Sequence, residues 1–294
     1  MNRILAKTAA VALLTFWALP AQPASGQGAY LPAIVEIRNR RLLVFDESVR
    51  TIPLPGWLSY PAYAGTADGT GLVAQRGSCI YKLEFSPQHE SPLGCLPDLG
   101  IEAMAPSADG KTILIEGRYG NGTTLYCGLF QLSLPGFSAR PITRHDCAVN
   151  IDGPSISLSE DGHQALTIVR HNLYLVDLKS GQTTQVGTGF DNISWSPDGR
   201  WVAAERAVSR ESTTTSTALL DSRSFKRRRE FAGVALVWSP DSRSLLRIKD
   251  CPKLEDIGTL EVIDTRTGAA RRVRSSTCRV QAAGTVWVSL KNPQ

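Results

Sequence analysis

The residues that could perform metal or acid–base chemistry are few and scattered. The chain contains four histidines, at His89, His145, His163 and His171. Each falls in or near an expected turn, and these turns are divided between opposite ends of the repeating units described below. They therefore cannot gather into the three-histidine centre typical of catalytic zinc sites. We expect solvated turn histidines instead.

Carboxylates and amides offer a second kind of chemistry. Several of them precede or open expected inner strands: Glu102, Asn150, Asp152, Asp191 and Asn192. Calcium prefers such oxygen ligands. If the inner strands surround a channel, these side chains could approach its mouth. We expect no cofactor, with a channel-bound calcium ion as the alternative.

Two polar segments could form a binding surface, because binding residues often lie on loops held by a rigid scaffold. Residues 117–124 and 209–216 each lengthen the connection between the second and third strands of a repeat. Both therefore belong to the same side of the fold, which we call the looped face. The candidate contact residues for a peptide, a glycan or a partner protein are Arg118, Tyr119, Tyr126 and Arg210.

The six cysteines suit an oxidising compartment. Six cysteines allow fifteen pairings. Three pairs, however, each flank an expected turn at nearly equal distances: Pro87, Phe137 and residues 266–268 respectively. Antiparallel strands place such residues opposite each other. The predicted disulfides are Cys79–Cys95, Cys127–Cys147 and Cys251–Cys278. The chain has no Cys-x-x-Cys pair that would favour a metal site instead.

A recurring turn in the sequence predicts the strands that position these residues. Residues 193–205 contain Trp-Ser-Pro-Asp-Gly, and residues 236–246 contain Trp-Ser-Pro-Asp-Ser. Looser copies bring the aspartates to positions 68, 109, 161, 198 and 241, with steps of 41, 52, 37 and 43 residues. Proline sets the first corner, aspartate bonds to nearby N–H groups and glycine accepts a positive φ. The period is that of a four-stranded propeller blade. The turn bonds also account for these aspartates, which are therefore not counted as metal ligands.

The two ends of the chain complete the ring. Three strand-like runs precede the first turn, at Ala33–Arg38, Leu42–Asp46 and Val49–Pro53, and a single run follows the last repeat at Thr285–Leu290. Together they make a sixth blade, which leaves no unpaired sheet edge where the ring closes. The predicted fold is all-β: a six-bladed β-propeller of four-stranded antiparallel blades. We also expect Trp195 and Trp238 to pack between blades.

The repeat resembles the TolB-like propeller family, whose blades carry a Trp-Ser-Pro-Asp-Gly turn between their first two strands. Residues 195–199 match that turn fully, 238–241 lack only the glycine, and the other copies keep Asp-Gly. The resemblance covers about the whole mature chain and implies the propeller fold. It implies no single function, because the same blade occurs in binding modules, protease domains and lyases. The chain contains no Gly-x-Ser-x-Gly motif, which disfavours a serine peptidase.

The N-terminus has the pattern of a secretory signal peptide. Arg3 and Lys7 precede an apolar stretch, Thr8–Leu19, which is too short to span a bilayer, and small residues at 24–26 suit cleavage. We predict a signal peptide at 1–26 and one propeller domain at 27–294. No later segment is apolar enough to be a transmembrane segment. The mature protein is expected to be a monomer in a bacterial periplasm or secreted.

The charge is mild but uneven. The formal net charge is +5, and removal of Arg3 and Lys7 leaves +3. Two basic runs, 226–229 and 271–274, fall on the expected outermost strands of the neighbouring blades 4 and 5. Arg50, with Arg38, Arg40 and Arg41 on the adjoining hairpin, continues this trend in blade 6. Such a rim could contact lipopolysaccharide, acidic lipid or an acidic protein. Alternatively, the charges guard sheet edges against aggregation. Nucleic acid is not an expected partner of an exported protein.

Two functional hypotheses follow. The first is an exported, non-catalytic propeller that binds a protein or an envelope polymer through the looped face. The alternative is a small propeller enzyme, a lyase or lactonase, with a metal in the central channel. The inner strands offer mostly Ala, Ser, Ile and Trp, which favours binding over catalysis.

Overall fold

The computed structural model describes residues 30–36, 41–45, 49–56, 63–120, 126–134, 136–146, 156–206, 216–251, 256–277 and 285–289. The predicted signal peptide at 1–26 lies outside these residues. So do several predicted positions: Arg38, Arg40, Cys147, Asn150, Asp152, Arg210 and Cys278. The described part of the chain contains no helix with the length and apolarity that crossing a bilayer requires.

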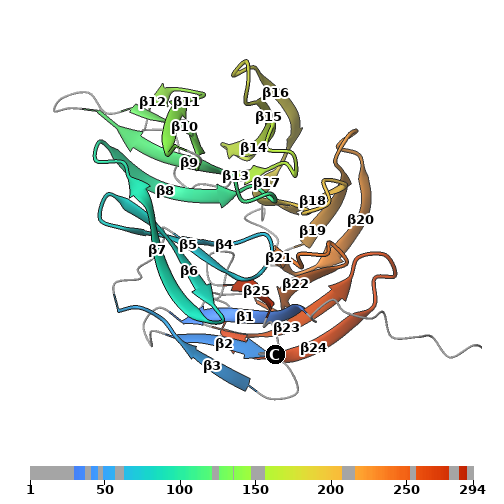
Figure 1. Cartoon of the computed structure of the whole chain (residues 1–294). Coiled ribbons are helices and arrows are strands. Elements are labelled where there is room, and N and C mark those ends of the chain that lie inside the picture. The colour runs from blue at the N-terminus through green and yellow to red at the C-terminus, as the bar shows by residue number, and fades with distance from the viewer. Residues whose placement is uncertain are drawn as a thin grey trace, which may run out of the picture.

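The described strands form six antiparallel sheets arranged in a ring, as predicted (Figure 1). Blade 1 contains β4 (Tyr63–Gly65), β5 (Gly71–Arg76), β6 (Cys79–Phe85) and β7 (Gln88–Cys95). Blade 2 contains β8 (Leu99–Pro106), β9 (Thr112–Tyr119), β10 (Tyr126–Ser133), β11 (Ser138–Pro141) and β12 (His145–Asp146). Blade 3 contains β13 (Ile156–Leu158), β14 (Gln164–Val169), β15 (Asn172–Asp177) and β16 (Thr183–Thr188).

Blades 4 and 5 have the same order of strands. Blade 4 contains β17 (Phe190–Trp195), β18 (Trp201–Arg206), β19 (Ser216–Asp221) and β20 (Arg227–Ala232). Blade 5 contains β21 (Val234–Trp238), β22 (Ser244–Lys249), β23 (Ile257–Asp264) and β24 (Ala270–Thr277). We call the strands of a blade A to D from the centre of the ring outwards.

The sixth blade joins the two ends of the chain, which confirms the predicted closure. It contains β25 (Thr285–Ser289), β1 (Tyr30–Glu36), β2 (Arg41–Phe45) and β3 (Val49–Pro53), in that order. Tyr30 pairs with Ser289 and Ile34 with Thr285. The C-terminal strand is thus the A strand of a sheet whose other strands come from the N-terminus, so the ring has no open seam.

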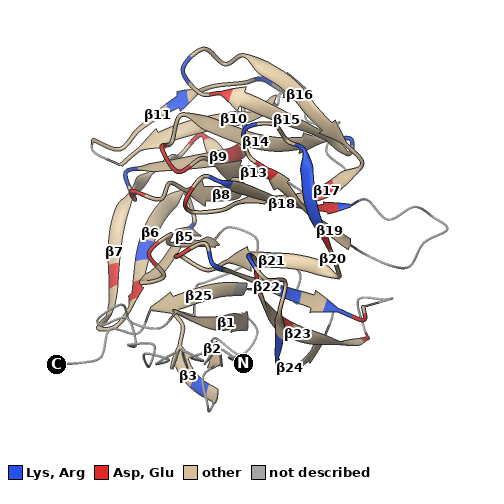
Figure 2. Cartoon of the chain, turned by 90° about the vertical axis from the view of Figure 1, so that its right-hand side faces the viewer, with Lys and Arg blue, Asp and Glu red and all other residues tan. Residues whose placement is uncertain are grey.

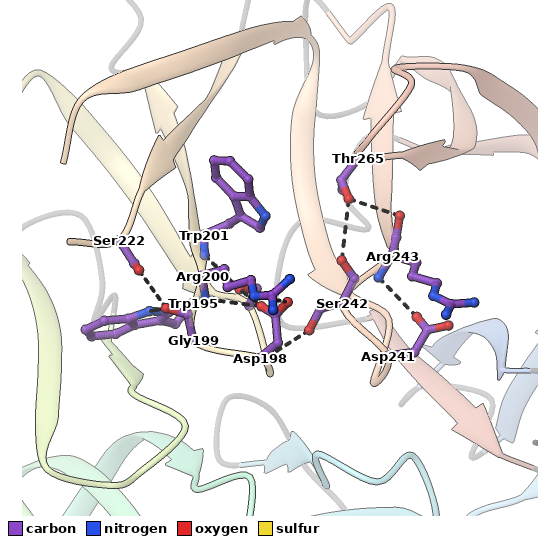
Figure 3. Close-up of polar contacts among 11 residues, drawn as sticks. Trp195, Asp198, Gly199, Arg200, Trp201, Ser222, Asp241, Ser242, Arg243 and Thr265 are labelled. Atoms are coloured by element: carbon purple, nitrogen blue, oxygen red, sulfur yellow. Dashed lines mark hydrogen bonds and ion pairs between the residues drawn. The ribbon is translucent and has the colours of Figure 1, made fainter. Parts of the chain in front are cut away.

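The recurring turns have the bonding that their residue types predict (Figure 3). Oδ1 of Asp198 accepts a hydrogen bond from the Ser196 hydroxyl at 2.7 Å and from the Arg200 N–H at 3.1 Å. Gly199 has a φ of +68°, which costs a glycine nothing. The corresponding N–H bonds are present in the other four turns. In blade 5, Ser242 stands at the glycine position and adopts a φ of +60°.

The core lies between neighbouring blades. Trp238 is 4% exposed, and its indole N–H donates to the Ser194 carbonyl of the preceding blade at 3.0 Å. Trp287 makes the equivalent bond to Val237 at 3.2 Å. Trp195 is buried with Leu166 of blade 3. Indoles thus bury a large apolar area and still satisfy their donors, and the expected packing of Trp195 and Trp238 is confirmed.

The disulfide Cys79–Cys95 is formed between residues that pair directly across β6 and β7, as predicted. Cys127 and Cys251 are also disulfide-bonded, but Cys147 and Cys278 lie outside the described residues, so these two pairings stay predictions. The expected register around Phe137 was wrong by two residues, because Cys127 pairs with His145. The physical reason is a turn placed earlier than Phe137: the innermost pair of that hairpin is Ser133 with Ser138.

Candidate binding face

The looped face is the side on which strand B joins strand C within a blade. In blade 2 the connection runs between β9 and β10, and in blade 4 between β18 and β19. Both therefore belong to one side of the ring, as predicted. Residues 121–125 and 207–215 lie outside the described residues, and Arg210 with them. The described part of this face is built from strand ends.

In blade 2 the predicted tyrosines meet. Tyr119 ends β9, Tyr126 begins β10, and the two pair directly with ring centroids 5.6 Å apart. Tyr119 also contacts Phe130 edge to face at 5.2 Å, which ties it to the core of the blade. The guanidinium of Arg144 lies over the Tyr126 ring, 3.1 Å from its centroid. The sequence analysis did not predict this cation–π contact. Arg144 directly precedes β12, and the pairing of β12 with β10 becomes evident only in the folded blade.

Arg118 has an anionic partner. Its Nε forms an ion pair with Oε1 of Glu102, and 53% of the Arg118 side chain remains exposed. The β8 strand carries a β-bulge at Glu102, between Ile101 and Ala103. A bulge re-aims the side chain of the extra residue, which here brings Glu102 to Arg118. The sequence analysis considered Glu102 as a possible calcium ligand and Arg118 as a separate contact residue. In the structure the two side chains form an ion pair.

A second polar cluster joins blades 3 and 4. His171 Nδ1 and Asp191 Oδ1 lie 2.6 Å apart. His171 occupies a two-residue hairpin turn with Arg170, and both residues have positive φ angles, +62° and +50°, as a type I′ turn requires. His171 is thus the solvent-exposed turn histidine that was expected, with 51% of its side chain exposed, and its contact with Asp191 is an addition to that expectation. His163 lies in an A–B turn at the opposite face, where its N–H donates to Asp161.

Glu205 completes this cluster. It pairs with Asn192 across β17 and β18, next to a bulge at Asp191. Burial, with a smaller contribution from the Asp191 carboxylate, raises the pKa of Glu205 from 4.5 to about 7. A carboxyl group with a pKa near 7 changes charge around neutral pH, and such groups often occur at functional sites.

The acidic residues of blades 2 and 4 occupy equivalent positions. Glu102 and Asp191 each lie five residues before the serine that opens the A–B turn, Ser107 or Ser196. In the same way Glu116, which is 2% exposed, corresponds to Glu205. Alignment of the repeats on their turns would have revealed this repeated acid pair.

The described residues provide no set of ligands that would support the hypothesis of channel-bound calcium. Within them, no group of three or more His, Cys, Asp or Glu side chains is placed to hold a metal ion. Glu102 contacts Arg118 and Asp191 contacts His171, so each of these carboxylates has a cationic or hydrogen-bonding neighbour. Asn150 and Asp152 lie outside the described residues, and calcium binding stays a hypothesis.

On the opposite face, the A–B turns of successive blades contact one another. The Asp198 N–H donates to the Ser242 hydroxyl oxygen at 2.8 Å, linking blades 4 and 5 (Figure 3). A Cβ atom at Gly199 would lie 3.2 Å from Oε2 of Glu160 in blade 3. The Ser289 N–H donates to the Gly69 carbonyl at 2.8 Å. These contacts fix the turns, whereas the connections on the looped face vary in length.

No protein-family model and no curated protein matches the sequence. Solved structures do resemble it. TolB from Acinetobacter baumannii is 15% identical, with a TM-score of 0.61 over 89% of this chain and 66% of that one. A putative TolB from Agrobacterium tumefaciens is 18% identical, with a TM-score of 0.55 over 86% of this chain and 91% of that one.

An enzyme also has this shape. An oligogalacturonate lyase from Vibrio parahaemolyticus is 11% identical, with a TM-score of 0.53 over 82% of this chain and 78% of that one. Similarities at such low identity establish the fold alone, and one propeller fold hosts several functions. The protein thus has the six-bladed β-propeller fold of the TolB structures.

Proposed function

We propose that the protein is an exported, non-catalytic propeller that binds a protein or an envelope polymer through its looped face. The observation that carries the proposal is the surface of blade 2, where Tyr126 lies between Tyr119 and the Arg144 guanidinium, beside the Arg118–Glu102 pair. Tyrosine and arginine are the residues that most often supply binding energy at protein interfaces.

The rigidity of this surface supports binding. Cys127, next to Tyr126, is disulfide-bonded, and Cys79–Cys95 fixes the same side of blade 1. A preorganised surface loses less conformational entropy when a partner binds. Disulfides also suit a protein of the periplasm or cell exterior, in keeping with the predicted signal peptide. The protein would act as a monomer without a cofactor.

One observation favours a second candidate, a small propeller lyase or lactonase. Glu205, with a pKa of about 7, lies near Asp191 and His171 on the same face. A carboxyl group poised near neutral pH suits general acid–base catalysis. The similarity to a lyase structure gives a substrate class to try first, the oligogalacturonates. A Glu205→Gln variant should abolish any such turnover without loss of folding.

The binding proposal is tested by affinity capture from envelope extract with three forms of the protein. The first is the wild type, and the second is Arg118→Ala/Arg144→Ala on the looped face. The third, Arg200→Ala/Arg223→Ala, removes two exposed arginines from turns on the opposite face and keeps the same net charge as the second. The proposal predicts a partner that the wild type and the control retain, and that the looped-face variant binds at least about tenfold more weakly, the cost of about 1.4 kcal/mol. A partner held equally by all three forms would contradict it.

A further inference from the structure

The outer wall of blades 4 and 5 is strongly basic. Strands β20 and β24 are the D strands of these blades and form their outer edges. Figure 2 shows blue Lys and Arg segments along both strands. Lys226 directly precedes β20. Six arginines lie on the two strands: Arg227, Arg228, Arg229, Arg271, Arg272 and Arg274.

Most of these charges face solvent. The side chains of Arg227 and Arg228 are 54% and 57% exposed, and Lys226, Arg271 and Arg272 are exposed as well. On the two strands themselves the acidic residue is Glu230, which pairs with Arg227 at 2.5 Å. Arg228 lies 3.5 Å from Asp221. Positive charge therefore exceeds negative charge on this wall.

Edge protection alone does not account for this distribution. Every blade exposes a D strand, and charged residues at edges prevent strands of different molecules from pairing. Yet β16 of blade 3, in the same position, contains no charged residue, and β7 of blade 1 carries Glu90 rather than a run of cations. The D strands β11 and β3 carry one arginine each, Arg140 and Arg50. The runs of arginines are therefore confined to two neighbouring blades, which indicates that they act together.

The two edges form one continuous surface. Arg229 reaches from blade 4 and donates to the Thr265 carbonyl of blade 5 at 3.4 Å. Arg274 lies against Phe45 of blade 6, with its guanidinium carbon 5.1 Å from the ring centroid. These contacts hold the blades side by side, so that the exposed cations of β20 and β24 can meet one extended partner.

The residue types indicate what that partner is. The cations are nearly all arginine, whose planar guanidinium forms paired hydrogen bonds with phosphate oxygens. The aromatic residue on these strands, Phe231, is 9% exposed, so the surface lacks the aromatic anchors typical of protein interfaces. An outer wall that presents several separate cations suits a flat array of phosphates better than a single small anion.

We propose that the basic wall formed by Lys226, β20 and β24 docks the protein on an anionic phospholipid surface. The proposal is independent of the looped face, which is one of the two sides of the ring and not part of its outer wall. Docked in this way, the molecule would stand on its side and leave the looped face accessible to a partner.

The test is sedimentation of the purified protein with two kinds of vesicle: pure phosphatidylcholine, and phosphatidylcholine with about one third phosphatidylglycerol. The wall variant is Lys226→Gln/Arg228→Gln/Arg271→Gln. The matched control, Lys111→Gln/Lys179→Gln/Arg200→Gln, removes three exposed cations from turns elsewhere. Each basic residue near an anionic surface strengthens binding about fivefold, so the wall variant should bind the anionic vesicles about a hundredfold more weakly.

The control should bind within about threefold of the wild type at the same salt concentration. Equal losses in the two variants would overturn the proposal, because binding would then follow net charge alone. Equal binding of the wild type to neutral and anionic vesicles would also overturn it. Inorganic phosphate should displace the protein no better than sodium chloride of the same ionic strength. Stronger displacement would indicate a site for free phosphate, and binding to duplex DNA without binding to vesicles would indicate nucleic acid; either result would refute a lipid surface.

Discussion

Glu205 should make the stability of the propeller depend on pH in an unusual direction. Burial and the Asp191 carboxylate raise its pKa from 4.5 to about 7. Between these two values the folded protein holds a proton that the unfolded chain has released. Stability therefore falls as the pH rises. The contribution of the protonated form is fully present below pH 4.5 and is lost as the pH passes about 7.

The size of the effect follows from the shift. Each pKa unit corresponds to about 1.4 kcal/mol, so the shift of Glu205 sets an upper bound of about 3 kcal/mol. The side chain keeps partial contact with solvent, and solvent screening reduces this bound to about 1.5 kcal/mol. A Glu205→Gln variant keeps the shape of the side chain but has no proton to lose. It should match the wild type near pH 4.5 and exceed it by about 1.5 kcal/mol at pH 8.

The assay is thermal unfolding, followed by circular dichroism, at a series of pH values. For a domain of this size, 1.5 kcal/mol corresponds to a rise in Tm of about 3–6 °C. Glu230→Gln is the matched control with the opposite sign. A hydrogen bond from the Ser216 hydroxyl holds the pKa of Glu230 below its usual value, so its stabilising contribution is present at neutral pH and is lost on acidification.

Two results would refute this reasoning. One is a Tm difference between Glu205→Gln and the wild type that does not change between pH 4.5 and pH 8. The other is a Glu205→Gln variant that is less stable at pH 8, because the ionised carboxylate would then stabilise the fold. Asp191→Asn separates the two causes: it should lower the pKa of Glu205 and leave the part that arises from burial.

Further predictions concern closure, the turns, a disulfide and calcium. Deletion of 285–294 removes the buried Val286, Trp287 and Val288 and should lower the Tm by at least about 10 °C; an unchanged Tm would contradict the closure. Ser242→Ala loses the bond from Asp198 and keeps the positive φ, so denaturant unfolding should show about 1 kcal/mol less stability, whereas Ser242→Gly relieves the strain and should lose less. Cys79→Ser/Cys95→Ser should cost about 3 kcal/mol in the same assay. Calorimetric titration with calcium should give no binding heat, and a Kd between about 10⁻⁷ and 10⁻³ M would instead support the metal-dependent alternative.

The fold could be predicted because its signals are local and repeated. The Asp-Gly turns fix where strands A and B reverse, and the unmatched strands at 33–53 and 285–290 can be satisfied only by joining each other. Cys79–Cys95 was predicted from a hairpin centred on Pro87. Phe85 pairs with Gln88, so the turn is centred slightly earlier, and a register shift between Ile80 and Tyr81 brings the two cysteines opposite each other.

The candidate site was predicted only in part, because its geometry depends on bulges. Glu102 and Asp191 each occupy an extra residue in an A strand, and the alternation of side chains along a regular strand gives no sign of such a residue. The ion pair of Arg118 and the contact of His171 both follow from these bulges. The register error at Cys127 has a similar origin, because it depends on where a turn closes.

Photo-crosslinking in living cells tests the proposed binding face most directly. A photo-reactive amino acid is placed at position 126 on the looped face, and in a second variant at position 200 on the opposite face. The account predicts a discrete crosslinked partner from position 126 that is absent from position 200 and is lost when Arg118→Ala/Arg144→Ala is added. Crosslinks to the same partner from position 200, with none from position 126, would contradict it.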